Sequence, residues 1–159
     1  MNPLENDGIQ WQWIWLYHTK NDVDSSFGCV LDVYIPQGDK SLTITVVYNR
    51  VQKRNQVFKG SVKKWNSTSY LHEYDDNASV PWASSVFILG IDYEKYVVIK
   101  NYLVGKDHPQ IYVGFRGMNP KEDAIKAANK TLQENGMSLK DLVRFSDCDE
   151  LWKLLGVKS

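Results

Sequence analysis

The sequence contains little cysteine and no long apolar segment. Its two cysteines, Cys29 and Cys148, lie far apart and lack the close spacing of a zinc site or a redox pair. No apolar run approaches the roughly 20 residues that cross a bilayer. The polar start MNPLENDG also lacks the basic and apolar regions of a signal peptide. We therefore expect a chain without a membrane span.

The sequence also has no excess of charge of either sign, since Lys plus Arg and Asp plus Glu number nineteen each. Without a basic excess, the chain has little with which to neutralise a phosphate backbone, so we do not expect nucleic acid as a partner. A length of 159 residues suits one domain with its own core and is short for two. We take residues 1–159 as a single domain.

Patterns typical of enzymes are scarce. His18, His72 and His108 fall in predicted loops or strand ends, with no nucleophile or acid at a telling spacing, and we expect them at the surface. Asp75 and Asp76 sit together in a turn and are not placed as a catalytic carboxylate pair. No glycine-rich phosphate loop follows a strand. We expect a protein that is not an enzyme and needs no metal or cofactor.

Two interpretations of the cysteines remain open at this point. They are either two buried thiols or a pair that ties the front of the chain to its tail. Three Asn-x-Ser/Thr sequons, at Asn66, Asn77 and Asn129, favour the second interpretation because such sites matter only in a secreted chain.

Strand patterns fill most of the sequence from Trp11 to about Phe115. The predicted strands span 10–17, 29–35, 41–51, 56–65, 69–74, 85–92, 96–102 and 110–116. Short breaks between them indicate antiparallel hairpins, since parallel strands would need crossover helices. Closing eight such strands into a barrel removes both sheet edges. The sequence therefore predicts an all-β, eight-stranded antiparallel up-and-down β-barrel over about 10–116.

The hydrophobic period changes to that of a helix at Asn119. Asn119 is the predicted N-cap, Pro120 the first helical residue, and Glu122 follows three residues after the cap. Apolar residues then recur at helical spacing, at Ala124, Ile125, Ala128 and Leu132. We expect one α-helix over about 120–134, packed outside the barrel.

The remaining residues, 137–159, form the predicted C-terminal tail. Gly136 is placed to take the left-handed conformation that ends the helix. The pattern SLKD predicts a short helical turn through Val143, after which the tail carries Cys148 back toward the barrel.

Half of the six tryptophans lie in the first predicted strand, which reads WQWIWLY over 11–17. In a strand, Trp11, Trp13, Trp15 and Tyr17 share one face. The interior of an eight-stranded barrel is either filled by side chains or holds one small ligand. A wall of indole rings suits a flat or aromatic ligand and also attracts cations.

The strand order, helix and tail resemble a lipocalin, and three short stretches resemble motifs of that family. Trp11 resembles the tryptophan of a Gly-x-Trp motif on the first strand, although isoleucine stands in the glycine position. The stretch GIDYEKY resembles a Thr-Asp-Tyr motif in Asp92 and Tyr93, with isoleucine in the threonine position. Arg116 resembles the arginine that ends the eighth strand in this family.

Within the family, the sequence is most similar to secreted insect lipocalins of the cockroach-allergen and bilin-binding types. The resemblance implies a disulfide between Cys29 and Cys148, whereas Tyr102 occupies a cysteine position of a second bridge. It also implies that Arg116 stacks on Trp11 at the closed end of the barrel. We correspondingly expect a secreted protein that is a monomer or a weak dimer.

Side-chain alternation gives the candidate ligand-binding residues. If Trp11 points inward, so do the other aromatics of its face, of which Trp13 is the one that could fill the barrel or contact a ligand. Counting back from Arg116 on the last strand places Gly114 inside as well. The predicted ligand-binding set is Trp13, Trp15, Tyr17, Asp32, Tyr48, Gln110 and Tyr112.

Asp32 bears on the class of ligand. If Cys29 points outward to reach the tail, Asp32 and Tyr34 share the inward face, and a carboxylate inside an aromatic barrel could pair with an amine. An exposed Asp at a strand end is the alternative, and alternation leaves it open because Val33 and Ile35 on the other face are apolar too.

The predicted function is that of an extracellular carrier that binds a small lipophilic or aromatic ligand, such as an aryl amine or semiochemical. Two alternatives stay open. One is a biliverdin-type pigment as the ligand, and the other is a barrel filled by tryptophans that acts as a protein-interaction module.

Overall fold

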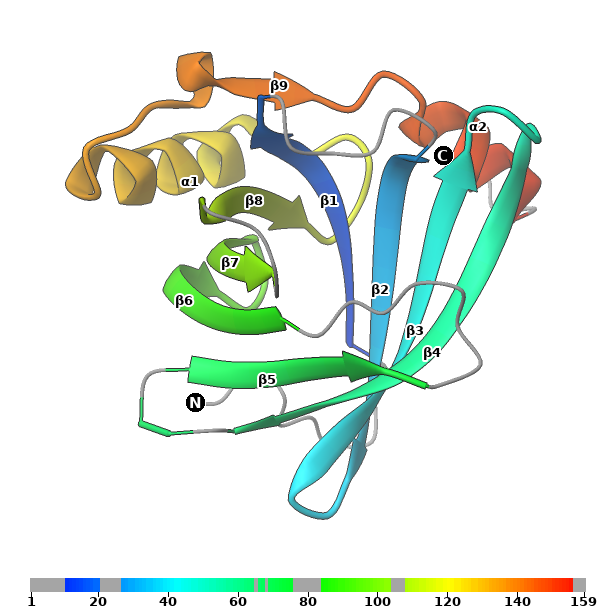
Figure 1. Cartoon of the computed structure of the whole chain (residues 1–159). Helices are drawn as coiled ribbons and strands as arrows, with labels where there is room; N and C mark the ends of the chain where they lie inside the picture. Colours follow the sequence, from blue (N-terminus) through cyan, green and yellow to red (C-terminus); the bar gives the residue numbers. More distant parts are fainter. Residues whose placement is uncertain are drawn as a thin grey trace.

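A computed structural model describes residues 11–20, 27–64, 66–67, 69–75, 84–103 and 108–155. In these ranges, one antiparallel sheet has the strand order β2-β3-β4-β5-β6-β7-β8-β1-β9, and β1 also pairs with β2, which closes eight strands into a barrel (Figure 1). The strands are β1 (Trp11–Thr19), β2 (Phe27–Gln37), β3 (Lys40–Asn49), β4 (Arg54–Lys64), β5 (Ser69–Tyr74), β6 (Ser84–Asp92), β7 (Tyr96–Leu103), β8 (Gln110–Phe115) and β9 (Leu142–Arg144). The predicted barrel is confirmed.

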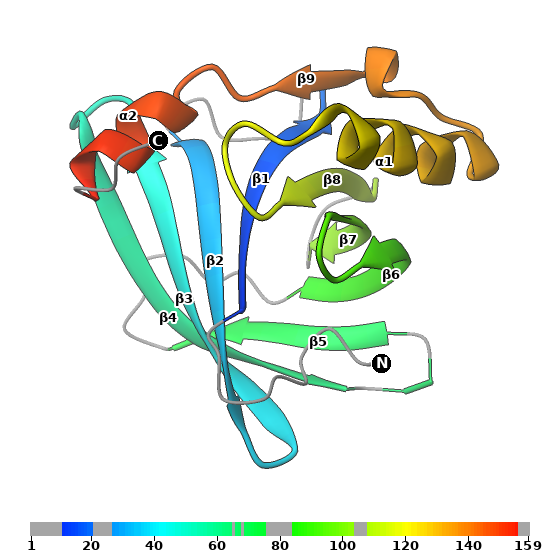
Figure 2. The ribbon, with the colours of Figure 1, turned by 180° about the vertical axis from the view of Figure 1, so that it is seen from behind.

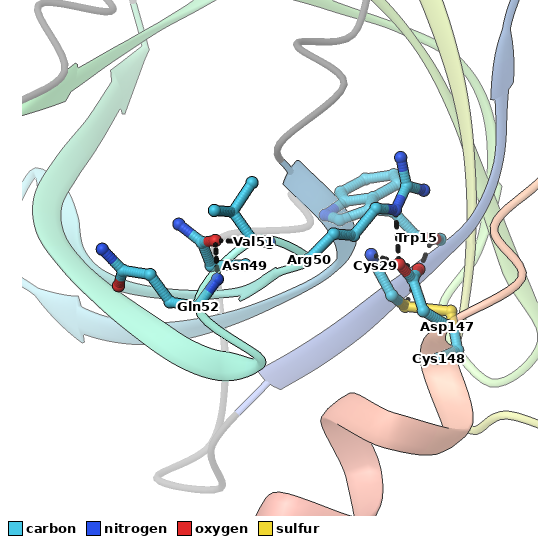
Figure 3. A network of polar contacts seen from close by, with 8 residues as sticks. All are labelled: Trp15, Cys29, Asn49, Arg50, Val51, Gln52, Asp147 and Cys148. Atoms are coloured by element: carbon cyan, nitrogen blue, oxygen red, sulfur yellow. Dashed lines mark hydrogen bonds and ion pairs between the residues drawn. A yellow bond between two sulfur atoms is a disulfide. The ribbon is translucent and has the colours of Figure 1, made fainter.

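Strand β3 ends two residues before its predicted end because Asn49 starts a turn. Its Oδ1 accepts from the backbone N–H groups of Val51 and Gln52, at 3.0 and 2.8 Å (Figure 3). Lys53 then takes a left-handed conformation at φ 53°. A side chain that satisfies two turn N–H groups favours a turn over continued strand.

The predicted helix is present as α1 (Glu122–Glu134), but its start differs from the prediction. The N-cap is Lys121, which makes no side-chain capping bond, so the expected Asn119 cap is wrong. Glu122 and Asp123 lie in the first turn, where carboxylates interact favourably with the helix dipole. The predicted helix end is confirmed, since Gly136 follows with φ 77°.

The C-terminal region contains more regular structure than predicted. Ser138 and Asp141 form the expected capping box, but the helical turn η1 covers only Leu139–Asp141, because the chain then extends into β9. A second helix, α2 (Cys148–Leu154), lies within the predicted tail. The expectation of a single helix is therefore corrected to two.

The two helices cover different parts of the barrel. α1 packs against β6 and β7, whereas α2 packs against β2, β3 and β4 (Figures 1 and 2). The approach of α1 is close at Gly90, where a Cβ would lie 2.6 Å from Cγ2 of Thr131. The largest buried cluster fills the space between the helices and the outer barrel face, from Ile14 to Leu151.

The disulfide implied by the family resemblance is confirmed. Cys29 on β2 and Cys148 at the start of α2 are bonded, with their Cα atoms 5.0 Å apart and a sequence separation of 119. This bond fixes α2 to the barrel.

Candidate ligand-binding site

The barrel encloses a cavity of about 310 Å³. Its wall is mainly aromatic and aliphatic, with a few polar groups. The lining residues are Trp13, Trp15, Phe27, Val30, Asp32, Tyr34, Thr45, Val47, Val62, Tyr70, His72, Tyr74, Ser84, Val86, Ile88, Val97, Ile99, Asn101, Leu103, Gln110, Tyr112 and Phe145. Trp13 and Trp15 lie in the wall of this cavity and leave its interior open. The alternative of a solidly filled barrel is therefore wrong.

Asp32 is buried in this wall, which excludes the alternative of an exposed strand-end aspartate. Trp15 Nε1 donates to Asp32 Oδ2 at 2.7 Å, and the Thr45 hydroxyl donates to Asp32 Oδ1. No lysine, arginine or histidine in the described ranges forms a salt bridge with this carboxylate. Its hydrogen-bond partners there are neutral donors, and Asp32 itself lines the cavity.

Two tyrosines beside Asp32 stay neutral. Burial raises the pKa of the Tyr34 hydroxyl well above its usual value, and the charge of Asp32 together with a hydrogen bond to it raises this pKa further. Burial also raises the pKa of Tyr74, again with a contribution from Asp32. Neutral phenols present aromatic faces and hydroxyl groups to a ligand and add no charge.

His72 lies on the same wall and is buried, so the expected surface position is wrong. Its Nε2 is hydrogen-bonded with the Thr43 hydroxyl at 3.2 Å, and the centres of the His72 and Tyr74 rings are 4.5 Å apart. Burial lowers the pKa of His72, while the charge of Asp32 partly opposes this shift. The imidazole is therefore neutral at pH 7.

Arg116 stacks on Trp13, and its expected contact with Trp11 stays a prediction. The guanidinium carbon lies 3.5 Å from the centre of a Trp13 ring, and Arg116 also donates to the carbonyl oxygens of Gln12 and Tyr93. The side chain of Trp11 lies outside the described structure.

The alternation argument is confirmed for most of the predicted residues. Trp13, Trp15, Asp32, Gln110 and Tyr112 all line the cavity. Whether these side chains bind a ligand stays a prediction.

Tyr17 does not line the cavity, because β1 contains an irregularity. Trp15 pairs with Gly114 but Tyr17 pairs with Val113, so one residue, Leu16, is extra on β1. A bulge of this kind reverses the alternation beyond it. Tyr17 therefore faces outward and packs edge-on against Phe115, with ring centres 6.3 Å apart.

Tyr48 also lies on the wrong face for the predicted role. Thr45 and Val47 of β3 line the cavity, whereas Tyr48 belongs to the outer buried cluster that includes Leu151 of α2. Because α2 covers the outside of β3, the apolar side chains Val46 and Tyr48 pack outward, whereas Thr45 of the same strand faces the cavity.

Phe145 is the lining residue that was least expected from the sequence. It lies between β9 and α2 and is 3% exposed. The centre of its ring lies 4.1 Å from the centre of the His18 ring. Every other lining residue belongs to one of the strands β1 to β8. The predicted disulfide was the one feature of the sequence that placed this segment next to the barrel.

The predicted glycosylation sites have different surroundings. Asn66 is exposed, and its Oδ1 accepts from the backbone and hydroxyl of Ser69. Asn129 lies inside α1, and its Oδ1 accepts from the backbone N–H of Leu139 at 2.9 Å. Asn77 falls outside the described residues.

Other site types find no support in the described part of the chain. Its His, Cys, Asp and Glu residues form no group of three or more that could hold a metal ion. None of its helices is both long enough and apolar enough to cross a membrane.

No family model matches the sequence, and no curated protein matches it. Solved structures do match. The major allergen Per a 4 from cockroaches is 19% identical over 87% of this chain and 87% of the allergen chain, with a TM-score of 0.71. The tryptamine complex of the amine binding protein of Rhodnius prolixus is 18% identical over 93% of this chain and 87% of that chain, with a TM-score of 0.68. Lobster apocrustacyanin A1 is 15% identical over 84% of this chain and 74% of the apocrustacyanin chain, with a TM-score of 0.67.

These structures are lipocalins, and the chain has the lipocalin fold. The resemblance to cockroach lipocalin allergens, predicted from the sequence, is confirmed at the level of the fold. Asp92, Tyr93 and Arg116 accordingly lie together at one end of the barrel, since Arg116 Nε donates to the Tyr93 carbonyl at 2.8 Å.

Proposed function

We propose that this protein binds a small aromatic amine in the barrel cavity and carries or sequesters it outside the cell, without chemical conversion. The observation that carries this proposal is the buried carboxylate of Asp32, held by Trp15 and Thr45. A buried charge is stabilised by an opposite charge. A ligand ammonium group would supply that charge, and the surrounding aromatic faces attract cations as well.

The size of the cavity supports a small ligand. Its volume of about 310 Å³ lies at the lower end of the roughly 300–1,000 Å³ found for ligand pockets. A bicyclic aryl amine suits this space, and the amine binding protein of Rhodnius prolixus, which has the same fold, was solved with tryptamine. A linear tetrapyrrole is several times larger than a bicyclic amine. A biliverdin-type pigment is therefore the less well supported ligand.

The disulfide supports an extracellular role. Structural disulfides form and persist in oxidising compartments and are rare in the cytosol. The Cys29–Cys148 bond closes most of the chain into one loop.

The proposal is tested by isothermal titration calorimetry with tryptamine and with its neutral analogue tryptophol. We expect tryptamine to bind more tightly, and Asp32→Asn to weaken tryptamine by at least about tenfold while leaving tryptophol nearly unchanged. Asp39→Asn is the matched control, since Asp39 is an exposed carboxylate on the turn between β2 and β3. Equal affinities for both ligands in the wild type, or an unaltered Asp32→Asn variant, would contradict amine recognition.

A further inference from the structure

Strands β1 and β2 pair along only part of their length. Their ladder runs from Trp11 and Tyr34 to Trp15 and Val30. Beyond that point β1 pairs with β9, from Tyr17 to Thr19. In both overall views the two strands diverge toward the end of the barrel where β9 and α2 lie (Figures 1 and 2).

The segment Phe145–Cys148, which we call the seam segment, is bonded to both diverging strands. On the β1 side, the Phe145 N–H donates to the Leu16 carbonyl at 2.9 Å. On the β2 side, the Cys29 N–H donates to Asp147 Oδ1 at 2.9 Å, and Cys29 is joined to Cys148 (Figure 3). The seam segment therefore replaces the missing part of the β1–β2 ladder.

Asp147 links the seam segment to a third element. Its Oδ2 forms a salt bridge with Arg50 Nε at 2.6 Å, and Arg50 lies in the turn between β3 and β4 (Figure 3). Asp147 is 9% exposed, and its side chain fills the space that a Cβ on Gly28 would need. A charge-assisted contact to a largely buried carboxylate fixes position better than a fully exposed pair.

Phe145 is the part of the seam segment that reaches the cavity. It lines the cavity wall, and its ring stacks at a tilt of 35° on the ring of His18. A large rigid ring at this point limits the space available to a ligand between β1 and β2.

We propose that Phe145 is a specificity-determining residue that sets the largest ligand the cavity accepts, and that Asp147 is the residue that positions it. The proposal deepens the function proposed above and rests on the cavity being a ligand site. It concerns ligand size and is independent of ligand charge, so two neutral probes test it separately from amine recognition.

The probes are 1-aminonaphthalene and N-phenyl-1-naphthylamine, which differ by one phenyl ring and change fluorescence in apolar surroundings. Phe145→Ala should shift the ratio of their dissociation constants in favour of the larger probe by about tenfold, because it adds space to an apolar pocket. Phe145→Leu, a milder change that keeps the core filled, should shift the ratio in the same direction by less. Val143→Ala on β9, at an exposed side chain, should leave it unchanged.

Asp147→Asn should shift the same ratio toward the larger probe, and Asp147→Glu should restore part of the wild-type value. A loss of stability alone would weaken both probes together and leave the ratio constant. An unchanged ratio in both Phe145 variants overturns the proposal, as does failure of either probe to bind both wild type and Phe145→Ala. Failure of tryptamine to bind, with the ratio shifted as expected, would contradict amine recognition only.

Discussion

Gly114 leaves the space in which the Trp15 indole lies. A Cβ on Gly114 would be 2.8 Å from Cε3 of Trp15 and 3.1 Å from a methyl group of Val97. From this position, Trp15 Nε1 reaches Asp32. The absence of one methyl group on β8 thus determines the geometry of a hydrogen bond on the far side of the indole.

Gly114→Ala is expected to destabilise the fold by about 1–3 kcal/mol, because overpacking forces neighbouring side chains to move. It should also weaken tryptamine binding, since the indole can no longer donate to Asp32 in its present position. Chemical unfolding and calorimetry measure the two effects. Gly117→Ala is the control, because nothing lies within 4 Å of a Cβ there. Equal behaviour of the two variants would show that Trp15 adjusts without cost.

Arg116→Lys is expected to lower the free energy of unfolding by about 2–3 kcal/mol. Lysine cannot reproduce the planar contact with Trp13 or the separate bonds to the Gln12 and Tyr93 carbonyls. Arg54→Lys, at an exposed arginine, is the matched control. Guanidinium chloride unfolding followed by tryptophan emission measures the difference, and similar midpoints for the two variants would contradict the expectation.

Removing the disulfide with Cys29→Ser and Cys148→Ser together is expected to cost about 4 kcal/mol, since the bond closes a long loop in the unfolded chain. The expected readout is a lower unfolding midpoint in the double variant, matched by wild type after reduction with dithiothreitol. A wild-type midpoint that does not respond to reduction would argue against this contribution.

Acid is expected to destabilise the protein through His72. Its pKa in the folded chain lies below the ordinary value near 6.5, so the unfolded chain takes up the proton first as the pH falls. The stabilising contribution is fully present above pH 6.5. It is lost progressively as the pH falls from there through the lowered pKa of the folded state. Burial lowers the pKa of His18 as well, which adds to the same trend.

Unfolding free energies measured at intervals from pH 7.5 down to pH 4.5 check this expectation. His72→Gln should flatten part of the pH dependence, while His108→Gln, at an exposed histidine, should leave it as in wild type. A slope that persists in full in His72→Gln would assign the acid sensitivity to other groups.

The barrel itself could be predicted from the sequence because its strands alternate and its turns are short. Alternation also placed Asp32 and Tyr112 in the cavity wall correctly, since β2 is regular from Val30 onward and β8 pairs with β7 without a register shift. The disulfide followed from the family resemblance, which fixed the pairing that spacing left open.

The errors arose where a tertiary contact overrides a local pattern. The extra residue Leu16 in β1 reverses the alternation and turns Tyr17 outward, yet no glycine or proline in the strand marks it. Tyr48 was misplaced because the apolar face of β3 packs outward under α2, while the face with Thr45 lines the cavity. His72 was expected at the surface, since nothing local indicates that Thr43, on β3 with one strand between it and β5, supplies a buried partner.

The seam segment also has a consequence for the order of folding. Phe145 is bonded to Leu16 and Cys148 to Cys29, and both partners lie more than a hundred residues earlier, so the gap between β1 and β2 can close only after the chain has been made as far as residue 148. Contacts at such sequence separation form slowly. During synthesis, the diverging ends of β1 and β2 therefore stay without this partner until residues 145–148 have been made. A chain that stops before residue 145 would expose an incomplete barrel to chaperones and proteases.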